Sequence, residues 1–302
     1  MFTAPQTKGS WLKGAGGKSV LIHAESMQRQ GLNFYVSLNL LIIMNKTALI
    51  TGAAGGIGQE LARIHAEKGG DLVLVDRNME SLLKLKRELE GKHKISVHIV
   101  IKDLFLPAVP NEIYDELADQ KIAVDYLINN AGLGDFGFFA DSDWSKQENM
   151  INLNIKALTH LTRLFLPDMI SRGNGKILNI ASTAAFQPGP TMSVYFASKA
   201  YVLNFSEAVN NEVKNKGITV TALCPGSTES GFHAAVMDDR PVKSRKRQPA
   251  RSVAEYGYEA MMKGTGVVIP GLKNKLMAFS VRFLPRSTVA KMAGKIQRRK
   301  HL

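Results

Sequence analysis

The sequence predicts a single α/β domain built on a doubly wound parallel sheet of about seven strands. Short, nearly continuous apolar runs alternate with amphipathic segments from residue 47 onward, which is typical of parallel strands covered by helices on both faces. A glycine-rich turn joins the first apolar run to the first amphipathic segment, as is common in open α/β sheets. With 302 residues, 45% of them hydrophobic, the chain can bury a full core.

Two local patterns define the expected elements: short apolar runs for strands, and apolar residues at three- and four-residue spacing for helices. We expect strands at 47–51, 72–75, 96–101, 125–128, 176–181, 218–223 and 267–269. We expect helices at 56–69, 78–91, 111–120, 144–172 and 195–216. Residues 1–43 show no sustained period and precede Met44. We therefore expect them to be an N-terminal extension, either disordered or upstream of the native start, and we expect the domain to span 44–302.

The first strand leads directly into the cluster Thr51-Gly-Ala-Ala-Gly-Gly-Ile-Gly58. Its glycines allow a tight turn, a close approach of the backbone to a pyrophosphate, and close packing of the next helix on the strand. The N-terminus of that helix would face the anion. The candidate phosphate-binding residues are therefore Gly52, Gly56, Ile57 and Gly58.

The second strand ends in Asp76, 24 residues after Gly52. A carboxylate at this place can bind both hydroxyls of an adenosine ribose and repels a 2′-phosphate, which favours NAD. The next residue, Arg77, could instead bind that phosphate and favour NADP. No basic residue lies among 53–55 to assist a phosphate, so we expect NAD, with NADP as the alternative.

A hydroxyl, a phenol and an ammonium group converge near the fifth expected strand. Ser182 follows this strand, and Tyr195 and Lys199 lie four residues apart on one face of the next helix. These groups are suited to moving a proton onto or off an oxygen atom. We expect the Lys199 cation to lower the pKa of Tyr195 from about 10 toward the working pH.

From 44 to about 270 the chain resembles the short-chain dehydrogenase/reductase family. Six motifs follow the family's order, and Ser230 stands where the family usually has a threonine. Besides the glycine turn, they are Asp103-Leu104, Asn129-Asn130-Ala131-Gly132, Asn154, Ser182 thirteen residues before Tyr195 with Lys199, and Pro225-Gly226 with Ser230.

The resemblance implies a Rossmann-type fold and an NAD(P)-dependent oxidoreductase that acts on a carbonyl or a secondary alcohol. Tyr195 would be the general acid or base, and Ser182 would hold the substrate oxygen. Lys199 would bind the nicotinamide ribose, and Asn154 would hold a water that relays protons. Cofactor contacts are expected from Gly52, Gly56, Ile57, Gly58, Asp76, Arg77, Asp103, Leu104, Asn130, Ala131, Gly132, Tyr195, Lys199, Pro225, Gly226 and Ser230.

Composition and residue spacing restrict the compartment, the membrane topology and the metal content that we expect for this protein. The single cysteine, Cys224, excludes an internal disulfide framework and favours a reducing, cytoplasmic compartment. The longest aliphatic run, 40–44, is far shorter than the roughly 20 residues that a membrane span needs. No pair of the seven histidines has metal-ligand spacing supported by nearby carboxylates or the cysteine, so we expect no metal.

The positive charge is concentrated at the C-terminal end. The formal net charge is +3 for 1–43, −4 for 44–239 and +14 for 240–302. In the segment 274–302, Met277, Val281 and Leu284 can share one helical face, and Val289, Met292 and Ile296 another, with Lys291, Lys295, Arg298 and Arg299 opposite. Such a basic amphipathic segment is typical of helices that lie on an anionic membrane, although a helix packed on the core or on a dimer partner would show the same pattern.

Substrate choice is expected downstream of Gly226, in 227–255, where the family commonly carries its lid. This stretch contains Phe232, His233, Val236 and Met237, followed by a basic run from Arg240 to Arg251. A hydrophobic carbonyl compound, or an acyl chain that carries an acidic group, would suit it. Family analogy suggests a homo-oligomer.

A different class of function is also compatible with the fold: a non-catalytic nucleotide-sensing or nucleic-acid-binding protein that uses the basic tail. Such a protein could lack one of the four catalytic groups. Because Asn154, Ser182, Tyr195 and Lys199 are all present, we expect an enzyme that has a small-molecule substrate and no nucleic-acid partner.

Overall fold

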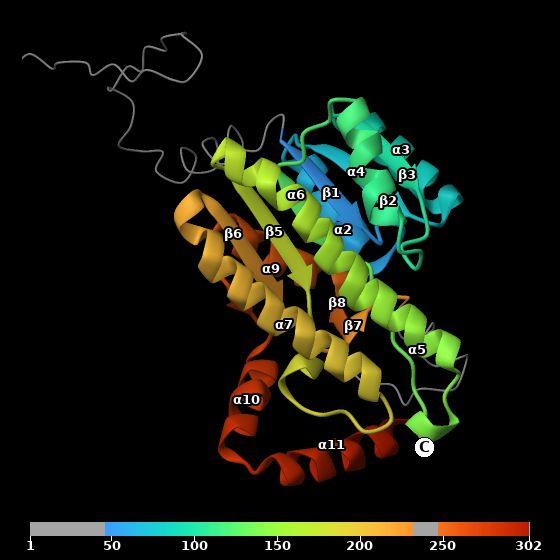
Figure 1. Cartoon of the computed structure of the whole chain (residues 1–302), viewed down its shortest axis with the longest axis vertical. Coiled ribbons are helices and arrows are strands. Elements are labelled where there is room, and N and C mark those ends of the chain that lie inside the picture. Colours follow the sequence, from blue (N-terminus) through green and yellow to red (C-terminus); the bar gives the residue numbers. More distant parts are fainter. Residues whose placement is uncertain (1–45, 232–246, 302) are drawn as a thin grey trace, which may run out of the picture. The chain divides into compact units, whose positions relative to one another are not determined.

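The computed structural model describes residues 46–231 and 247–301 (Figure 1). Residues 44–302 belong to one compact unit. The expected extension, 1–43, lies outside the described residues. So does 232–246, which holds the apolar part of the expected lid and most of its basic run.

Seven parallel strands form one sheet in the order β3-β2-β1-β4-β5-β6-β9. The bounds are β1 (Thr47–Thr51), β2 (Asp71–Asp76), β3 (Val97–Ile101), β4 (Tyr126–Asn129), β5 (Gly175–Ile180), β6 (Ile218–Leu223) and β9 (Val267–Val268). The sequence prediction of a doubly wound parallel sheet is confirmed, and each strand end lies within one residue of its expected place. The strand order reverses between β1 and β4, where such sheets form a crevice at their carboxyl edge.

Helices cover both faces of the sheet. Their bounds are α2 (Gly56–Glu67), α3 (Met79–Lys92), α4 (Val109–Asp119), α5 (Trp144–Ile151), α6 (Leu158–Arg172), α7 (Ser193–Val213), α9 (Ala250–Met262), α10 (Leu272–Ser280) and α11 (Arg286–His301). The helices α2 and α9 pack against each other on one face, and α4, α6 and α7 lie on the other. A separate pair of short parallel strands, β7 (Thr228–Glu229) and β8 (Gln248–Pro249), flanks the segment that is not described.

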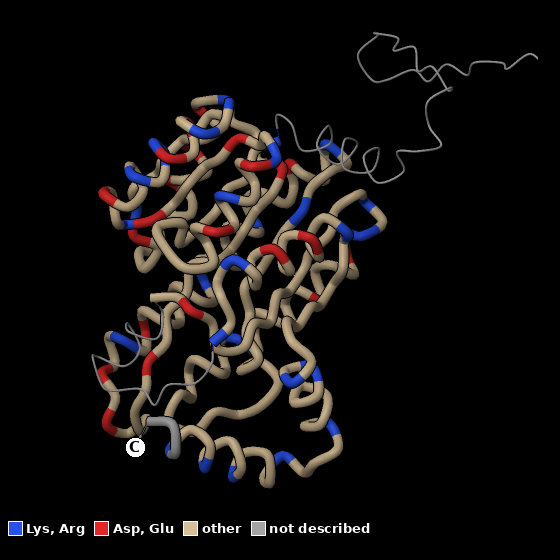
Figure 2. Tube along the Cα trace, turned by 180° about the vertical axis from the view of Figure 1, so that it is seen from behind, with Lys and Arg blue, Asp and Glu red and all other residues tan. Residues whose placement is uncertain are grey.

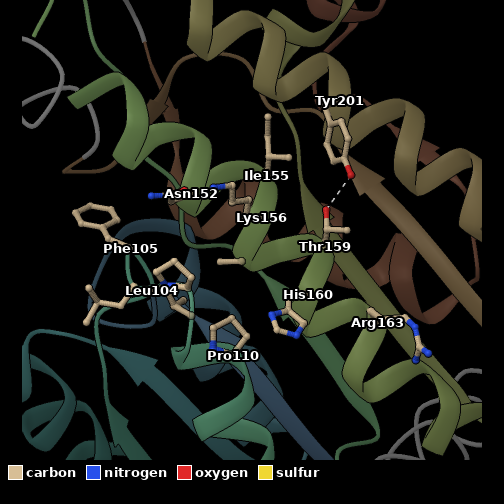
Figure 3. A pocket seen from close by; sticks show the side chains of 13 residues that line it. Leu104, Phe105, Pro110, Asn152, Ile155, Lys156, Thr159, His160, Arg163 and Tyr201 are labelled. Carbon is tan, nitrogen blue, oxygen red and sulfur yellow. Dashed lines mark hydrogen bonds between the residues drawn. The ribbon is translucent and has the colours of Figure 1, made fainter. Parts of the chain in front are cut away.

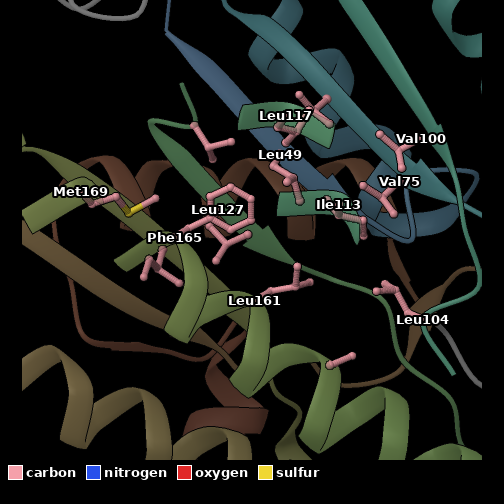
Figure 4. Close-up of a cluster of buried hydrophobic side chains, with 14 of the residues drawn as sticks. Leu49, Val75, Val100, Leu104, Ile113, Leu117, Leu127, Leu161, Phe165 and Met169 are labelled. Carbon is pink, nitrogen blue, oxygen red and sulfur yellow. The ribbon is translucent and has the colours of Figure 1, made fainter. Parts of the chain in front are cut away.

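The main core lies between the sheet and the helices α4 and α6 (Figure 4). Leu49 and Leu127 point into it from adjacent central strands, and Ile113 and Phe165 meet them from the two helices; all four are at most 4% exposed. The central strands are buried on both faces, which explains why their sequences are continuously apolar rather than alternating.

The long helix expected at 144–172 is present in three parts. A π-helical turn, η3 (Asn152–Ala157), separates α5 from α6. The wider turn adds a residue to one helical circuit, and such turns are frequently found at functional sites. Here it places Asn154, which is 1% exposed, on the buried side of the helix.

The C-terminal segment forms two helices separated at Pro285, and the prediction for α11 needs a correction. Val289 is 6% exposed, but Met292 and Ile296, expected on the same face, are 52% and 47% exposed. The buried side instead consists of Val289, Ala293 and Gln297, which repeat every four residues. The helix is rotated relative to the expectation because small residues let it approach the body closely. In the described parts of the chain, none of the helices combines the length and apolarity needed to cross a membrane.

Candidate active site

The glycine turn after β1 has a backbone that other residues could hardly adopt. Gly52 and Gly56 have φ angles of +65° and +56°, a region that disfavours side chains. A Cβ atom on Gly58 would lie 2.3 Å from the carbonyl oxygen of Gly52, and one on Gly56 would lie 2.8 Å from the Cβ atom of Ser230. No side chain caps the N-terminus of α2. The bare, inward-facing backbone at this helix end therefore fits a pyrophosphate group.

Two polar side chains brace this turn against the end of β4. The Thr51 hydroxyl oxygen accepts hydrogen bonds from the backbone N–H groups of Asn130 (3.1 Å) and Ala131 (3.0 Å). The Asn130 side-chain amide donates to the carbonyl oxygens of Thr51 and Gly52, both at 3.0 Å. Asn130 therefore supports the turn with its amide. The role of Thr51 was missed in the sequence, where only its position at the strand end hinted at it.

The acidic residue at the end of β2 lies beside the same turn. One carboxylate oxygen of Asp76 accepts from the backbone N–H of Ala54 (3.1 Å) and the other from that of Asn78 (3.0 Å). The neighbouring Arg77 guanidinium lies 3.7 Å from an oxygen of Asp103 and 5.3 Å from the ring centroid of Phe105. Asp76 is thus held against the glycine turn, whereas Arg77 is engaged with the loop after β3.

Asn154 and Lys199 converge on Gly132. A Cβ atom on Gly132 would lie 3.3 Å from Lys199 Nζ and 3.4 Å from Asn154 Oδ1, so both groups use the space that glycine leaves open. Asn154 donates to the Leu133 carbonyl (2.8 Å) and to Ser198 Oγ (3.0 Å), and its Oδ1 accepts from the Leu133 N–H (2.9 Å). Both amide hydrogens of Asn154 are therefore used, and one lone pair of Oδ1 stays available. Leu133 and Ser198 were not recognised from the sequence.

Ser182 and Tyr195 meet at the carboxyl edge of the sheet. Ser182 begins the short 3₁₀ helix η4 (Thr183–Phe186), and its hydroxyl oxygen accepts from the Ala184 N–H at 3.1 Å. The same side chain is hydrogen-bonded to the Tyr195 phenol. Lys199 Nζ lies 5.9 Å from the Tyr195 ring centroid and donates to the Ile180 carbonyl at 2.8 Å.

The structure corrects the expected direction of the Tyr195 pKa. Burial raises the pKa of Tyr195 above its ordinary value of 10, and the hydrogen bond from Ser182 acts in the opposite direction. Burial also lowers the pKa of Lys199 to about 8. Desolvation therefore disfavours the charged form of both groups, and it is the largest cause of each shift.

The segment after β6 closes the site from another side. The Pro225 carbonyl accepts from the Thr183 N–H at 2.9 Å, next to Ser182. A Cβ atom on Gly226 would lie 2.6 Å from the side-chain amide of Asn274 in α10. Pro225 and Gly226 thus join the catalytic edge of the sheet to the C-terminal helices, a contact that nothing in the sequence indicated.

Leu104 is placed apart from this cluster. It is 7% exposed, belongs to the core, and lines a cavity of about 430 Å³ together with Pro110, His160 and Arg163 (Figure 3). A hydrogen bond of 3.0 Å joins Thr159 and Tyr201 at its wall. None of the four catalytic candidates lines this cavity. The described residues also contain no group of three potential metal ligands.

A glycine cradle for a dinucleotide next to a buried proton-transfer group defines the class of nicotinamide-dependent oxidoreductases. The family model described as short chain dehydrogenase matches residues 46–241, more than half of the chain. The chain therefore belongs to the short-chain dehydrogenase/reductase family, whose chemistry is the interconversion of carbonyl and alcohol groups with a nicotinamide cofactor.

The similar proteins include two named vertebrate reductases. Very-long-chain 3-oxoacyl-CoA reductase-B of Danio rerio is 34% identical over 186 residues, which cover 60% of this chain and 59% of the fish protein. Very-long-chain 3-oxoacyl-CoA reductase of Anas platyrhynchos is 30% identical over 256 residues, which cover 82% of this chain and 78% of the duck protein. The comparisons give no support to the alternative of a non-catalytic nucleotide sensor or nucleic-acid-binding protein.

Solved structures show the same fold with either cofactor. A short-chain dehydrogenase from Sphingobium yanoikuyae in complex with NADPH is 31% identical, covers 79% of this chain and 92% of its own, and has a TM-score of 0.71. A short-chain dehydrogenase/reductase from Burkholderia phymatum in complex with NAD is 25% identical, covers 80% and 92%, and has a TM-score of 0.69.

Proposed function

We propose that this protein reduces the carbonyl group of a small molecule to a secondary alcohol, or catalyses the reverse, with Tyr195 as the general acid or base. The observation that carries the proposal is the hydrogen-bonded pair of Ser182 and Tyr195 beside the buried ammonium group of Lys199. A bound nicotinamide cofactor would supply or accept the hydride at this place.

The four side chains would have separate roles. Ser182 would donate a hydrogen bond to the substrate oxygen and so hold it against the Tyr195 phenol, which would deliver or remove the proton. Lys199 would bind the nicotinamide ribose through the N–H donors that Ile180 does not use. Asn154 has one Oδ1 lone pair left, which is suited to holding a single relay water.

The protonation state of Tyr195 supports reduction as the working direction. Because burial raises its pKa above 10, the phenol is protonated at neutral pH and is ready to act as an acid. In the oxidation direction it would have to lose this proton first, and that requires a higher pH. We therefore expect the rate of oxidation to rise more steeply with pH than the rate of reduction.

The substitution Tyr195→Phe tests the assignment directly. It removes only the phenolic oxygen, so we expect kcat to fall by about 100- to 10,000-fold, the usual contribution of general acid catalysis. Binding of NADH or NADPH, measured by fluorescence titration, should change by less than about threefold, which is below 1 kcal/mol.

The matched control is Tyr201→Phe on the same helix, whose hydroxyl bonds only to Thr159 among the described partners. We expect it to keep kcat within about twofold, since it lies away from the proton-transfer groups. Turnover retained in Tyr195→Phe, or lost equally in both variants, would contradict the assignment.

For the cofactor, we propose NAD in preference to NADP. The Asp76 carboxylate, held against the glycine turn by the Ala54 N–H, would accept hydrogen bonds from ribose hydroxyls and repel a 2′-phosphate. Arg77 is balanced by Asp103 and packs over Phe105, which reduces its use for binding a phosphate. We also propose the other cofactor contacts that the sequence analysis names. Among them, Ser230 packs next to Gly56 of the glycine turn.

We further propose that the substrate is an apolar carbonyl compound or an acyl chain that carries an acidic group. The two vertebrate relatives are named for very-long-chain 3-oxoacyl-CoA, and the segment 227–255, which we propose as the substrate lid, combines apolar and basic residues. The basic segment 274–302 would contact an anionic membrane at its surface.

A homo-oligomer is proposed as well. The cavity beside α6 and α7 has the exposed side chains Leu106 (59%) and Tyr201 (38%) in its lining. A second copy could cover these side chains and fill the cavity, because an apolar hollow of this kind is typical of an interface. Light scattering of the purified protein would give its mass, and a monomer at micromolar concentration would contradict this proposal.

A further inference from the structure

The outer side of α10 carries an apolar stripe that faces away from the body of the protein. Leu272, Leu276, Phe279 and Phe283 follow one another at four- and three-residue spacing, so they lie along one side of the helix and its continuation. Their exposed fractions are 72%, 60%, 57% and 72%, whereas Ala278 is 4% exposed. We call these four residues the α10 stripe. Large apolar side chains gathered in this way on a surface indicate an interaction site.

The charge around the stripe indicates what it binds. Residues 272–301 contain nine Lys and Arg residues and no Asp or Glu, and Figure 2 shows the basic positions distributed along both C-terminal helices. An anionic bilayer complements both properties, because its headgroups attract the cations while its interior takes up the apolar side chains. A second copy docked on the same surface would bring two strongly positive surfaces together, which is unfavourable.

The two helices that carry this surface also contact the edge of the catalytic site. Asn274 of α10 packs against Gly226, and Gly294 of α11 lies so close to Pro190 that a Cβ atom there would be 3.2 Å from the proline Cγ. Pro190 belongs to the loop between Ser182 and Tyr195. Figure 1 shows α10 and α11 beyond the carboxyl end of β5, beside the segment that leads into α7. We call these two helices the wall.

We propose that the α10 stripe docks on an anionic bilayer, and that the wall formed by α10 and α11 thereby delivers a long-chain apolar ketone from the bilayer to Tyr195. The inference rests on the proposed function for its chemistry. NADH or NADPH is the reductant: the carbonyl carbon gains a hydride, the oxygen gains the Tyr195 proton, and a secondary alcohol forms. The cofactor leaves oxidised, and solvent returns the proton to Tyr195.

Vesicle flotation of the full chain tests the docking. The probe is phosphatidylcholine vesicles with or without about 30% phosphatidylglycerol. We expect flotation with the anionic vesicles only. The triple variant Leu276→Ser, Phe279→Ser, Phe283→Ser should lower the bound fraction by about tenfold or more, since three apolar side chains no longer enter the bilayer.

The matched control replaces two equally exposed apolar residues elsewhere, Met79→Ser and Trp144→Ser, which are 54% and 61% exposed. This variant should float like the wild type. A charge variant, Lys291→Glu with Lys295→Glu, should lower flotation without removing any apolar group. No flotation of the wild type, or equal loss in the control, would overturn the docking surface. A change of mass in light scattering with the triple variant alone would mean that the stripe binds a second copy.

Turnover rates on soluble and membrane-embedded ketones distinguish a loss of membrane docking from a loss of catalysis. The triple variant should reduce a short, water-soluble ketone within about twofold of the wild type, but a long-chain ketone embedded in anionic vesicles about tenfold more slowly. Equal rates of the two proteins on the embedded ketone would overturn delivery from the bilayer. Normal flotation without turnover of any ketone would contradict the proposed function and leave the docking supported.

Discussion

The cofactor end of the site and its substrate wall are built in opposite ways. At the cofactor end, the turn from Gly52 to Gly58 is held by backbone geometry and by hydrogen bonds of about 3 Å that the Thr51 hydroxyl accepts and the Asn130 amide donates. At the substrate wall, α10 and α11 contact the body through small residues such as Gly294 and leave large apolar side chains in solvent. Internal hydrogen bonds hold the turn of the first region and leave the N–H groups at the start of α2 open for an anion, whereas the second region has an exposed apolar surface.

This difference suggests a division of labour. A rigid, glycine-lined cradle holds a cofactor in one position, which defines the reaction class. We propose that the wall formed by α10 and α11, with its exposed apolar side, determines which molecules reach that position. Changes at the cradle should therefore affect every substrate, and changes at the wall should affect only some.

The largest effect on cofactor affinity is expected from a glycine-to-alanine substitution in the cradle. The same substitution in the wall serves as the comparison. Gly58→Ala would place a Cβ atom 2.3 Å from the Gly52 carbonyl oxygen, so the cradle must deform, and we expect cofactor affinity to fall by about 100-fold or more, near 3 kcal/mol. Gly294→Ala places its Cβ atom 3.2 Å from Pro190 Cγ at the edge of the wall, and we expect less than about a threefold change in cofactor affinity. Calorimetric titration with NADH measures both. Equal losses would refute the contrast between a rigid cradle and a tolerant wall.

An intermediate effect is expected at His65, which links the C-terminal end of α2 to α9. Its ring lies 2.8 Å from the Tyr258 hydroxyl and 2.9 Å from the Lys46 carbonyl, so the neutral ring donates through Nε2 and accepts through Nδ1. Burial lowers the pKa of His65 from 6.5 to about 4. The folded state therefore binds fewer protons than the unfolded state, and stability present above pH 6.5 is lost as the pH falls toward 4, by about 3 kcal/mol in total.

Urea unfolding between pH 7 and pH 4 measures this contribution. In His65→Gln, which has no ring to protonate, the same fall in the free energy of unfolding should be smaller by about 3 kcal/mol. Parallel pH profiles of wild type and variant would show that the buried histidine does not couple the two parts of the chain.

The smallest effect is expected from Arg77→Ala. If NAD is the cofactor, the loss of this guanidinium should change kcat/KM with NADH by less than about threefold, because the charge is exposed and already paired with Asp103. The control is Arg87→Ala, an exposed arginine on α3. A fall of about tenfold or more with NADPH alone, in a protein that prefers NADPH, would instead assign Arg77 to a 2′-phosphate.

Much of this architecture follows from local sequence. The strands were predictable because they are short apolar runs, most of them buried on both faces, and the glycine turn because the positive φ angles of Gly52 and Gly56 strongly favour glycine. The partners of Asn154 were not predictable, since the π-helical turn that turns it toward Leu133 has no clear local pattern. The helix α9 was also missed, although its residues are amphipathic.

The sequence by itself determined the fold class through its periodicity, and it carried the family resemblance through its ordered motifs. The convergence of Ser182, Tyr195 and Lys199 was predictable because Ser182 ends a strand and the other two residues lie four apart on the next helix. Only the tertiary structure decided the direction of the Tyr195 pKa, the buried side of α11 and the outward orientation of the α10 stripe. These properties depend on which distant groups remove water from a side chain, and residue spacing along the chain carries no information about that.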